Sequence, residues 1–127
     1  MKILIADADN FFRILLSQLL YDDGYDVTSA HTAGRAWEYL IKDPPDICIF
    51  DSGLPEICEM AMEERGRPGS WFSSIPVILL TGGGQVPEAW RNAADFYVEK
   101  KRDADGLLPR IEELLGEISN GAGRGRS

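Results

Sequence analysis

Carboxylates, a hydroxyl and an ammonium group follow four separate apolar segments of this sequence. Each lies within three residues of the end of its segment, and in chain order they are Asp7, Asp9, Asp51, Thr81 and Lys100. Carboxylate oxygens bind hard cations such as Mg²⁺, whereas ammonium and hydroxyl groups donate hydrogen bonds to phosphate oxygens. If the fold brings these side chains together, they suit a divalent cation beside a phosphoryl group.

The apolar segments have the lengths of β-strands and alternate with helical patterns. The five segments are residues 2–6, 25–29, 47–50, 76–80 and 96–98. Strands that alternate with helices pair in parallel through right-handed crossovers, and a parallel sheet is buried on both faces. The sequence therefore predicts a doubly wound α/β fold. Ligands of such folds bind beyond the carboxyl ends of the strands, where the polar residues lie.

Five segments carry helical patterns of unequal strength. The first begins after Asp9, a candidate N-cap, and Gly24 predicts its end; Thr32 is the candidate N-cap of the second. The stretch at residues 66–74 is rich in Gly, Pro and Ser and predicts a loop. The remaining helices are predicted at residues 55–65, 87–93 and 107–118, of which the last has the clearest amphipathic stripe.

Length and charge narrow the function classes. With 127 residues the chain fits one domain, predicted over residues 1–118 and followed by a flexible Gly/Arg-rich tail at 119–127. The net charge of −8 disfavours nucleic acid as a partner, and no apolar run is long enough to span a membrane. Cys48 and Cys58 make neither a zinc site nor a disulfide framework. We therefore expect a cytoplasmic location.

The ordered set of motifs resembles the CheY-like receiver family of response regulators. It consists of Asp7, then DSGLP with Asp51, then ILLTG with Thr81, then YVEK with Lys100, and the resemblance covers about residues 2–118. It implies a flavodoxin-like, five-stranded parallel sheet of order 2-1-3-4-5 with five helices. It also implies a signalling module of two-component phosphorelays rather than an enzyme. A histidine kinase or phosphotransfer protein would phosphorylate Asp51, and an effector domain or downstream protein would read the result.

The resemblance also assigns roles to single residues. Asp7, Asp51 and the carbonyl of Gly53 would bind Mg²⁺, and Asp9 is a further candidate ligand as well as the candidate N-cap. The phosphate-contacting and switch residues would be Thr81, Gly82, Tyr97 and Lys100. Tyr97 is equally compatible with plain packing on an edge strand. His31, the only histidine, lies in a turn and is expected at the surface, far from these residues.

The sequence departs from the family pattern at several places. Ala8 replaces the second of two adjacent acids, and Lys101 follows Lys100 where the family usually has a proline. Glu59 replaces a usual glycine, and the segment between Thr81 and Tyr97 is short by almost a helical turn. We therefore expect Mg²⁺ binding to be weakened or absent in an atypical, degenerate receiver.

Two alternative functions remain at this point. The first is a phosphorylation-independent module that keeps the receiver fold and docks a partner constitutively. The second is an enzyme of another doubly wound family, such as a flavodoxin-like protein. The second alternative is weak, because acids follow the first strand where a flavin phosphate would require a Ser/Thr/Gly turn. The triplet Gly82–Gly84 lacks the Lys and Ser/Thr of a P-loop and predicts a flexible lid.

Overall fold

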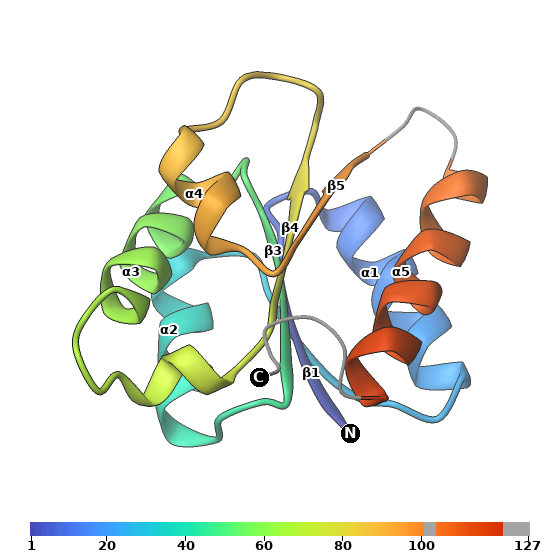
Figure 1. Ribbon diagram of the computed structural model, residues 1–127. Coiled ribbons are helices and arrows are strands. Elements are labelled where there is room, and N and C mark those ends of the chain that lie inside the picture. The colour runs from blue at the N-terminus through green and yellow to red at the C-terminus, as the bar shows by residue number, and fades with distance from the viewer. Residues whose placement is uncertain (101–103, 121–127) are drawn as a thin grey trace.

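The computed structural model is a five-stranded parallel sheet covered by helices on both faces (Figure 1). The strand order is β2-β1-β3-β4-β5, as predicted. The structure describes residues 1–100 and 104–120, apart from the side chains of residues 104–108. The elements are β1 (Lys2–Ala6), α1 (Asn10–Asp22), β2 (Asp26–Ala30), α2 (Ala33–Lys42), β3 (Ile47–Asp51), α3 (Pro55–Arg65), the 3₁₀ helix η1 (Trp71–Ser74), β4 (Val77–Thr81), α4 (Glu88–Ala93), β5 (Phe96–Glu99) and α5 (Ala104–Ser119).

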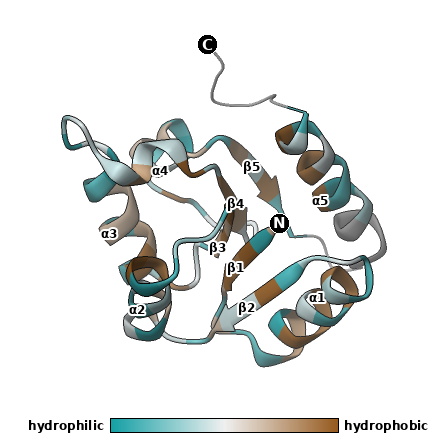
Figure 2. Ribbon diagram, turned by 90° about the horizontal axis from the view of Figure 1, so that it is seen from below, coloured by the Kyte–Doolittle hydropathy of each residue, from teal (hydrophilic) through white to brown (hydrophobic). Residues whose placement is uncertain are grey.

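The two faces of the sheet carry separate apolar cores, because successive residues of a strand point to opposite sides. On β3, Ile47 and Ile49 pack toward α1 and α5, whereas Cys48 and Phe50 pack toward α2 and α3. Figure 1 shows α2, α3 and α4 on one side of the sheet and α1 and α5 on the other. Hydropathic colouring places the apolar strands between these helices (Figure 2). The continuous apolar runs in the sequence thus reflect burial on both faces.

The predicted helix caps are present. The Asp9 carboxylate accepts a hydrogen bond from the Phe12 N–H, and the Thr32 hydroxyl accepts one from the Arg35 N–H. Gly24 follows α1 with a φ of 96°, a conformation that favours glycine. These caps fix where α1 and α2 begin. The first turn of α1 therefore lies near the carboxyl end of β1.

Several boundaries differ slightly from the sequence prediction. The strands β3, β4 and β5 each end one residue later than predicted; β4 also begins one residue later, and β2 is shifted by one residue. The extension incorporates Asp51 and Thr81 into the strands because both are buried and paired in register with the next strand. The predicted loop at residues 66–74 contains η1, whose Phe72 is buried in the core. Residues 121–127 of the predicted tail lie outside the described residues.

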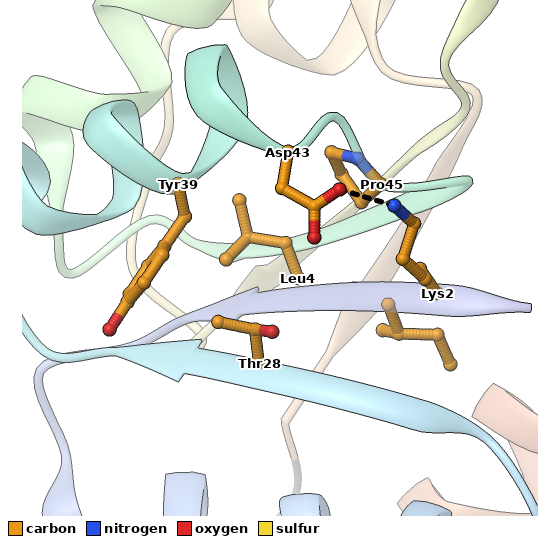
Figure 3. A pocket seen from close by; sticks show the side chains of 7 residues that line it. Lys2, Leu4, Thr28, Tyr39, Asp43 and Pro45 are labelled. Atoms are coloured by element: carbon orange, nitrogen blue, oxygen red, sulfur yellow. Dashed lines mark hydrogen bonds and ion pairs between the residues drawn. The ribbon is translucent and has the colours of Figure 1, made fainter.

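At the amino ends of the strands, polar contacts surround Lys2, the first residue of β1 (Figure 3). The Lys2 ammonium pairs with Asp43 at the end of α2, and the Lys2 backbone N–H donates to Asp46 Oδ2 at 2.7 Å. The paired side chains at this end are exposed, in contrast to the buried acids beyond β1 and β3. Among the described residues, no helix combines the length and the apolar character that a membrane span requires.

Candidate functional site

Asp7, Asp51 and Lys100 converge at the carboxyl end of the sheet. The Lys100 ammonium Nζ lies 2.6 Å from Asp7 Oδ2 and 3.0 Å from Asp51 Oδ1. Asp7 is 1 % exposed and Asp51 7 % exposed, whereas the Lys100 side chain is 16 % exposed. One ammonium thus bridges two buried carboxylates from neighbouring strands, and this trio was predicted from the sequence.

One carboxylate oxygen of Asp51 accepts a hydrogen bond, and the other does not. Its Oδ2 accepts a hydrogen bond from the Gly53 N–H at 2.8 Å. Its Oδ1 is buried and lies within ion-pair distance of Lys100, but the approach lacks hydrogen-bond geometry, so that oxygen has no hydrogen-bond partner in the described part of the chain. Of the four carboxylate oxygens of Asp7 and Asp51, it is the one without a hydrogen bond in the described residues, which makes it a candidate for binding a cation or for reaction.

Gly53 is confined by the same carboxylate. A Cβ added at this position would lie 2.6 Å from Asp51 Oδ2, which is closer than real Cβ atoms approach a heavy atom. A side chain here would therefore have to displace the Asp51 carboxylate from the position that the structure shows. The Cys58 thiol contacts the Asp51 backbone carbonyl at 3.6 Å from the next helix.

Burial and charge shift the protonation of the trio. Burial raises the pKa of the Asp7 carboxyl, and the hydrogen bonds from Lys100 and from the Asp9 N–H offset this only in part. Burial alone would lower the pKa of Lys100, but its contacts with the carboxylates of Asp7 and Asp51 outweigh burial and raise it. The lysine is therefore held in its charged form, and one ammonium balances one of the two carboxylates.

The predicted switch residues Thr81 and Tyr97 contact neighbouring residues of their own segments. The Thr81 hydroxyl is buried and engaged in its own turn, accepting from the Gly83 N–H and lying 3.4 Å from the Gly84 carbonyl oxygen. A Cβ at Gly82 would meet nothing within 4 Å, so the space beside Thr81 is open. Tyr97 is half-buried against the core, with the Arg91 guanidinium 4.9 Å from its ring centre. The switch role of these residues stays a prediction.

The side chains of Asp9 and His31 are both exposed. The Asp9 carboxylate caps α1, as one of its two predicted roles required, and only its backbone N–H donates to Asp7. His31 is exposed, as predicted, but the prediction that it lies far from the site residues is wrong: the Ala30 carbonyl before it accepts a hydrogen bond from the Asp7 N–H at 3.1 Å, because β2 and β1 end side by side. Lys101 lies outside the described residues. Ala8 is exposed beside the trio, so the missing acid leaves open space there.

The carboxylates of the site suit Mg²⁺, but there are few of them. No cluster of three or more His, Cys, Asp or Glu side chains suited to a metal occurs in the described residues. Asp7 and Asp51 nevertheless offer two carboxylates, and Mg²⁺ in proteins is often held by one or two carboxylates and several waters. The orphaned Asp51 Oδ1 is a candidate ligand atom. The Lys100 ammonium lies against both carboxylates, so a cation bound there would share their oxygens with it.

Sequence reasoning missed two side chains of α1 that reach the site. Arg13 Nη1 donates a hydrogen bond to the Asp7 carbonyl oxygen at 3.0 Å, and Phe12 contacts Lys100. The Phe12 ring of α1 lies 4.1 Å from Lys100 Nζ, measured to the ring centre. In the sequence, Phe12 reads as part of the apolar stripe of α1, since nothing in a single chain indicates that a distant lysine reaches it. Its position three residues after a capping acid was the only available signal, because that spacing turns Phe12 toward the strand ends.

Comparison with known proteins gives a consistent match. The response regulator receiver domain family matches residues 3–112. The chain is 31% identical over 117 residues to the DNA-binding dual master transcriptional regulator RpaA of Synechocystis, and 31% over 118 residues to the virulence transcriptional regulatory protein PhoP of Salmonella typhimurium. These alignments cover 90% and 91% of this chain but 48% and 52% of the relatives, so the chain spans about half their length.

Solved structures agree with this match. A CheY-like receiver domain protein from Methanospirillum hungatei superposes with a TM-score of 0.73 at 29% identity, covering 95% of this chain and 98% of the other. The response regulator TrrA from Thermotoga maritima, solved in complex with Mg²⁺-BeF, gives a TM-score of 0.71 at 28% identity, covering 89% and 97%. The sheet order and the five helices are those of this group. Neither comparison favours the flavodoxin-like or the phosphorylation-independent alternative.

Proposed function

This chain belongs to the response regulator receiver domain family, and on that premise we propose that Asp51 is its phosphoacceptor. The observation that carries the proposal is the environment of Asp51 Oδ1. This oxygen is buried, lacks a hydrogen-bond partner in the described residues and lies 3.0 Å from a charged lysine. The other carboxylate of the trio, Asp7, is hydrogen-bonded at both oxygens, to the Asp9 N–H and to Lys100. Asp51 is thus the acid whose oxygen is available for attack.

The reaction is a transfer from a phosphohistidine of a kinase or phosphotransfer protein. An Asp51 oxygen attacks phosphorus, and the bond between phosphorus and the donor nitrogen breaks with its electron pair remaining on nitrogen. The Gly53 N–H holds the second Asp51 oxygen during attack. Lys100 supplies positive charge to the phosphoryl oxygens, and the Thr81 hydroxyl, now engaged in its own turn, is a candidate donor to them.

Charge balance explains why a cation belongs to the proposal. Asp7 and Asp51 contribute two negative charges and Lys100 one positive charge, which leaves the pocket at −1 before a phosphoryl group enters. When bound between Asp7, Asp51 and the Gly53 carbonyl, Mg²⁺ would supply the charge that offsets the transferring oxygens. We propose that its affinity is low, because Ala8 provides no ligand and Lys100 occupies both carboxylates.

The proposed setting is cytoplasmic two-component signalling, with this domain as a switch rather than a turnover enzyme. An effector domain or a downstream protein would read the phosphorylated state. The high negative charge supports a role without nucleic acid for this domain. Two free, buried cysteines are compatible with a reducing compartment.

Phosphotransfer from acetyl phosphate in the presence of Mg²⁺ tests the assignment without needing the natural kinase. We expect the mass of one phosphoryl group to be added, at a position that peptide mapping assigns to Asp51. Asp51→Asn should abolish the modification, and Asp9→Asn, which changes an exposed acid beside the site, should retain it. Modification of another carboxylate, or none at high donor and Mg²⁺ concentrations, would refute the proposal.

Restoring the missing acid tests the proposed weakness of the cation site. We expect Ala8→Asp to tighten Mg²⁺ binding by about 10-fold or more, since even partners outside the metal's own ligand shell change affinity by about 10- to 100-fold. Titration calorimetry of wild type and variant measures the difference. Ala8→Asn, which adds the same volume with half the oxygen donors and no charge, is the matched control. Equal affinity in wild type and Ala8→Asp would contradict a weakened site.

A further inference from the structure

The Lys100 ammonium is surrounded on three sides. Asp7 Oδ2 and Asp51 Oδ1 lie 2.6 and 3.0 Å away, and the Phe12 ring centre lies 4.1 Å away. An ammonium with only two anionic neighbours has room to swing along its flexible four-carbon stem. The aromatic face closes the third side, at a distance typical of a cation–π contact.

The backbone holds both partners of this contact in place. The Lys100 N–H donates to the Thr81 carbonyl at 2.6 Å, which anchors the lysine at the end of β5. The Phe12 N–H donates to Asp9 Oδ1 at 3.1 Å, which fixes the first turn of α1. Phe12 is half-buried against the core that contains α1 and α5. The ring and the ammonium therefore meet through two independently fixed elements.

We propose that Phe12 is a positioning residue, whose aromatic face holds the Lys100 ammonium between Asp7 and Asp51. A lysine held in this way is already placed beside the acceptor oxygen of Asp51, so less reorganisation is needed when a phosphoryl group arrives. The link to phosphorylation rests on the proposed function, whereas the placement of the ammonium does not.

Replacement of Phe12 by pentafluorophenylalanine separates ring charge from ring size. The substitution keeps the shape of the ring nearly unchanged and reverses the charge of its face. Phe11, on the same helix and 77 % exposed, is the matched control position for the same replacement. Phe12→Tyr retains the negative face, and Phe12→Leu removes the ring. Thermal unfolding of each protein identifies variants that fail to fold.

Hydrogen exchange of the Lys100 ammonium, followed by ¹⁵N-detected nuclear magnetic resonance, reports the placement directly. A cation–π contact is worth a factor of about 2 to 30 in an equilibrium. We expect exchange to accelerate by a factor in that range with pentafluorophenylalanine at position 12 and in Phe12→Leu. We expect no change in Phe12→Tyr or with the replacement at position 11. Unchanged exchange with the fluorinated ring at position 12, or equal changes at positions 11 and 12, overturns the proposal.

The rate of labelling by acetyl phosphate then connects placement to function. We expect it to fall in the same variants and by a similar factor. If wild type takes up no phosphoryl group at Asp51, the proposed function fails while the exchange measurement still decides the role of Phe12. If labelling proceeds and follows ring volume rather than ring charge, Phe12 acts by packing alone and the positioning role is refuted.

Discussion

At the scale of single residues, the tightest constraint in the site is the space at Gly53. Any side chain there meets the Asp51 carboxylate, because an added Cβ would approach Oδ2 to 2.6 Å. Gly53 places this oxygen in two ways. Its N–H donates a hydrogen bond to Oδ2, and its lack of a Cβ leaves room for the carboxylate. The acceptor geometry therefore depends on a residue that has no side chain of its own.

Gly53→Ala is expected to slow phosphoryl transfer to Asp51 by about 10-fold or more while the protein stays folded. The physical reason is displacement of the carboxylate from its fixed position, since small misplacements of reacting groups cost large factors in rate. Labelling kinetics with acetyl phosphate measure the effect. Gly34→Ala is the control, because a Cβ at Gly34 meets nothing within 4 Å. Equal rates in the Gly53 variant and wild type would show that Asp51 tolerates the shift.

The buried acid Asp7 should reduce the stability of the fold at neutral pH. Its pKa is raised by burial even though Lys100 attracts its charge, so the folded state disfavours the ionised form. The resulting penalty is absent below the unfolded pKa of about 4 and grows as pH rises through the folded value. Asp7→Asn removes the ionisation, and we expect it to raise the free energy of unfolding by roughly 1 kcal/mol at pH 7.

Urea unfolding at pH 7 and at pH 3.5 measures this change. The gain should shrink at the lower pH, where Asp7 of the wild type is protonated as well. A loss of stability in Asp7→Asn at pH 7 would mean that the pair with Lys100 outweighs burial.

The sequence predicted the two acids and the lysine of the site but not the side chains of α1 that reach it. Asp7, Asp51 and Lys100 each follow a strand, and parallel strands end at one edge, so topology alone brings them together. The side chain of Phe12 comes from a helix, and its contact depends on helix rotation and on the reach of Lys100. Periodicity identifies the buried stripe of a helix but not the distant side chain that meets one of its members.

At the scale of elements, Arg65 joins α3 to the segments that flank β4 and β5. Its Nη1 donates to the Ala93 carbonyl at the end of α4, and its Nη2 donates to the Ile75 carbonyl and to Asp95 Oδ2. Asp95 Oδ2 also accepts from the Val77 N–H at 2.8 Å. The pair is largely buried, so it holds the short α4 and the start of β5 in register with β4.

Arg65→Met is expected to lower the free energy of unfolding by about 3–5 kcal/mol, because it removes the arginine of a largely buried ion pair. Arg65→Lys should recover only part of this loss, since a single ammonium lacks the planar fork that reaches three acceptors. Arg67→Met is the control at an exposed position two residues away, with an expected change below about 1 kcal/mol. Denaturant unfolding measures all three. Similar values for the Arg65 and Arg67 variants would argue against a buried anchor.

The sequence allowed strands and helices to be predicted, but not the side-chain contacts that join one element to another. The period of apolar residues indicated each strand and helix, and capping residues indicated where α1 and α2 begin. The pair Arg65–Asp95 spans 30 positions and has no local pattern. The η1 turn escaped prediction because Gly, Pro and Ser around it are typical of loops, although Phe72 packs in the core.

At the scale of the whole molecule, two buried thiols are expected to make the free energy of unfolding fall at alkaline pH. Cys48 and Cys58 are both free and buried in the core between the sheet and α2–α3. Burial raises the pKa of the Cys58 thiol to about 12 and raises that of Cys48 as well. In the unfolded chain a thiol titrates near pH 8.5, so between this pH and the pKa in the fold the folded state retains protons that the unfolded state releases.

The sign of the pH dependence follows from this difference. The free energy of unfolding is at its full value below about pH 8.5 and falls as pH rises toward the folded pKa, by up to about 1.4 kcal/mol per pH unit for each thiol. The double variant Cys48→Ala, Cys58→Ala lacks both ionisations and should show a shallower decline between about pH 9 and 11, although cavities lower its stability at every pH. Urea unfolding of both proteins across this range isolates the slope, because lysines and tyrosines titrate equally in the two. Parallel slopes would mean that the thiols ionise as readily inside the fold as outside it, and that the core between the sheet and α2–α3 is open to water.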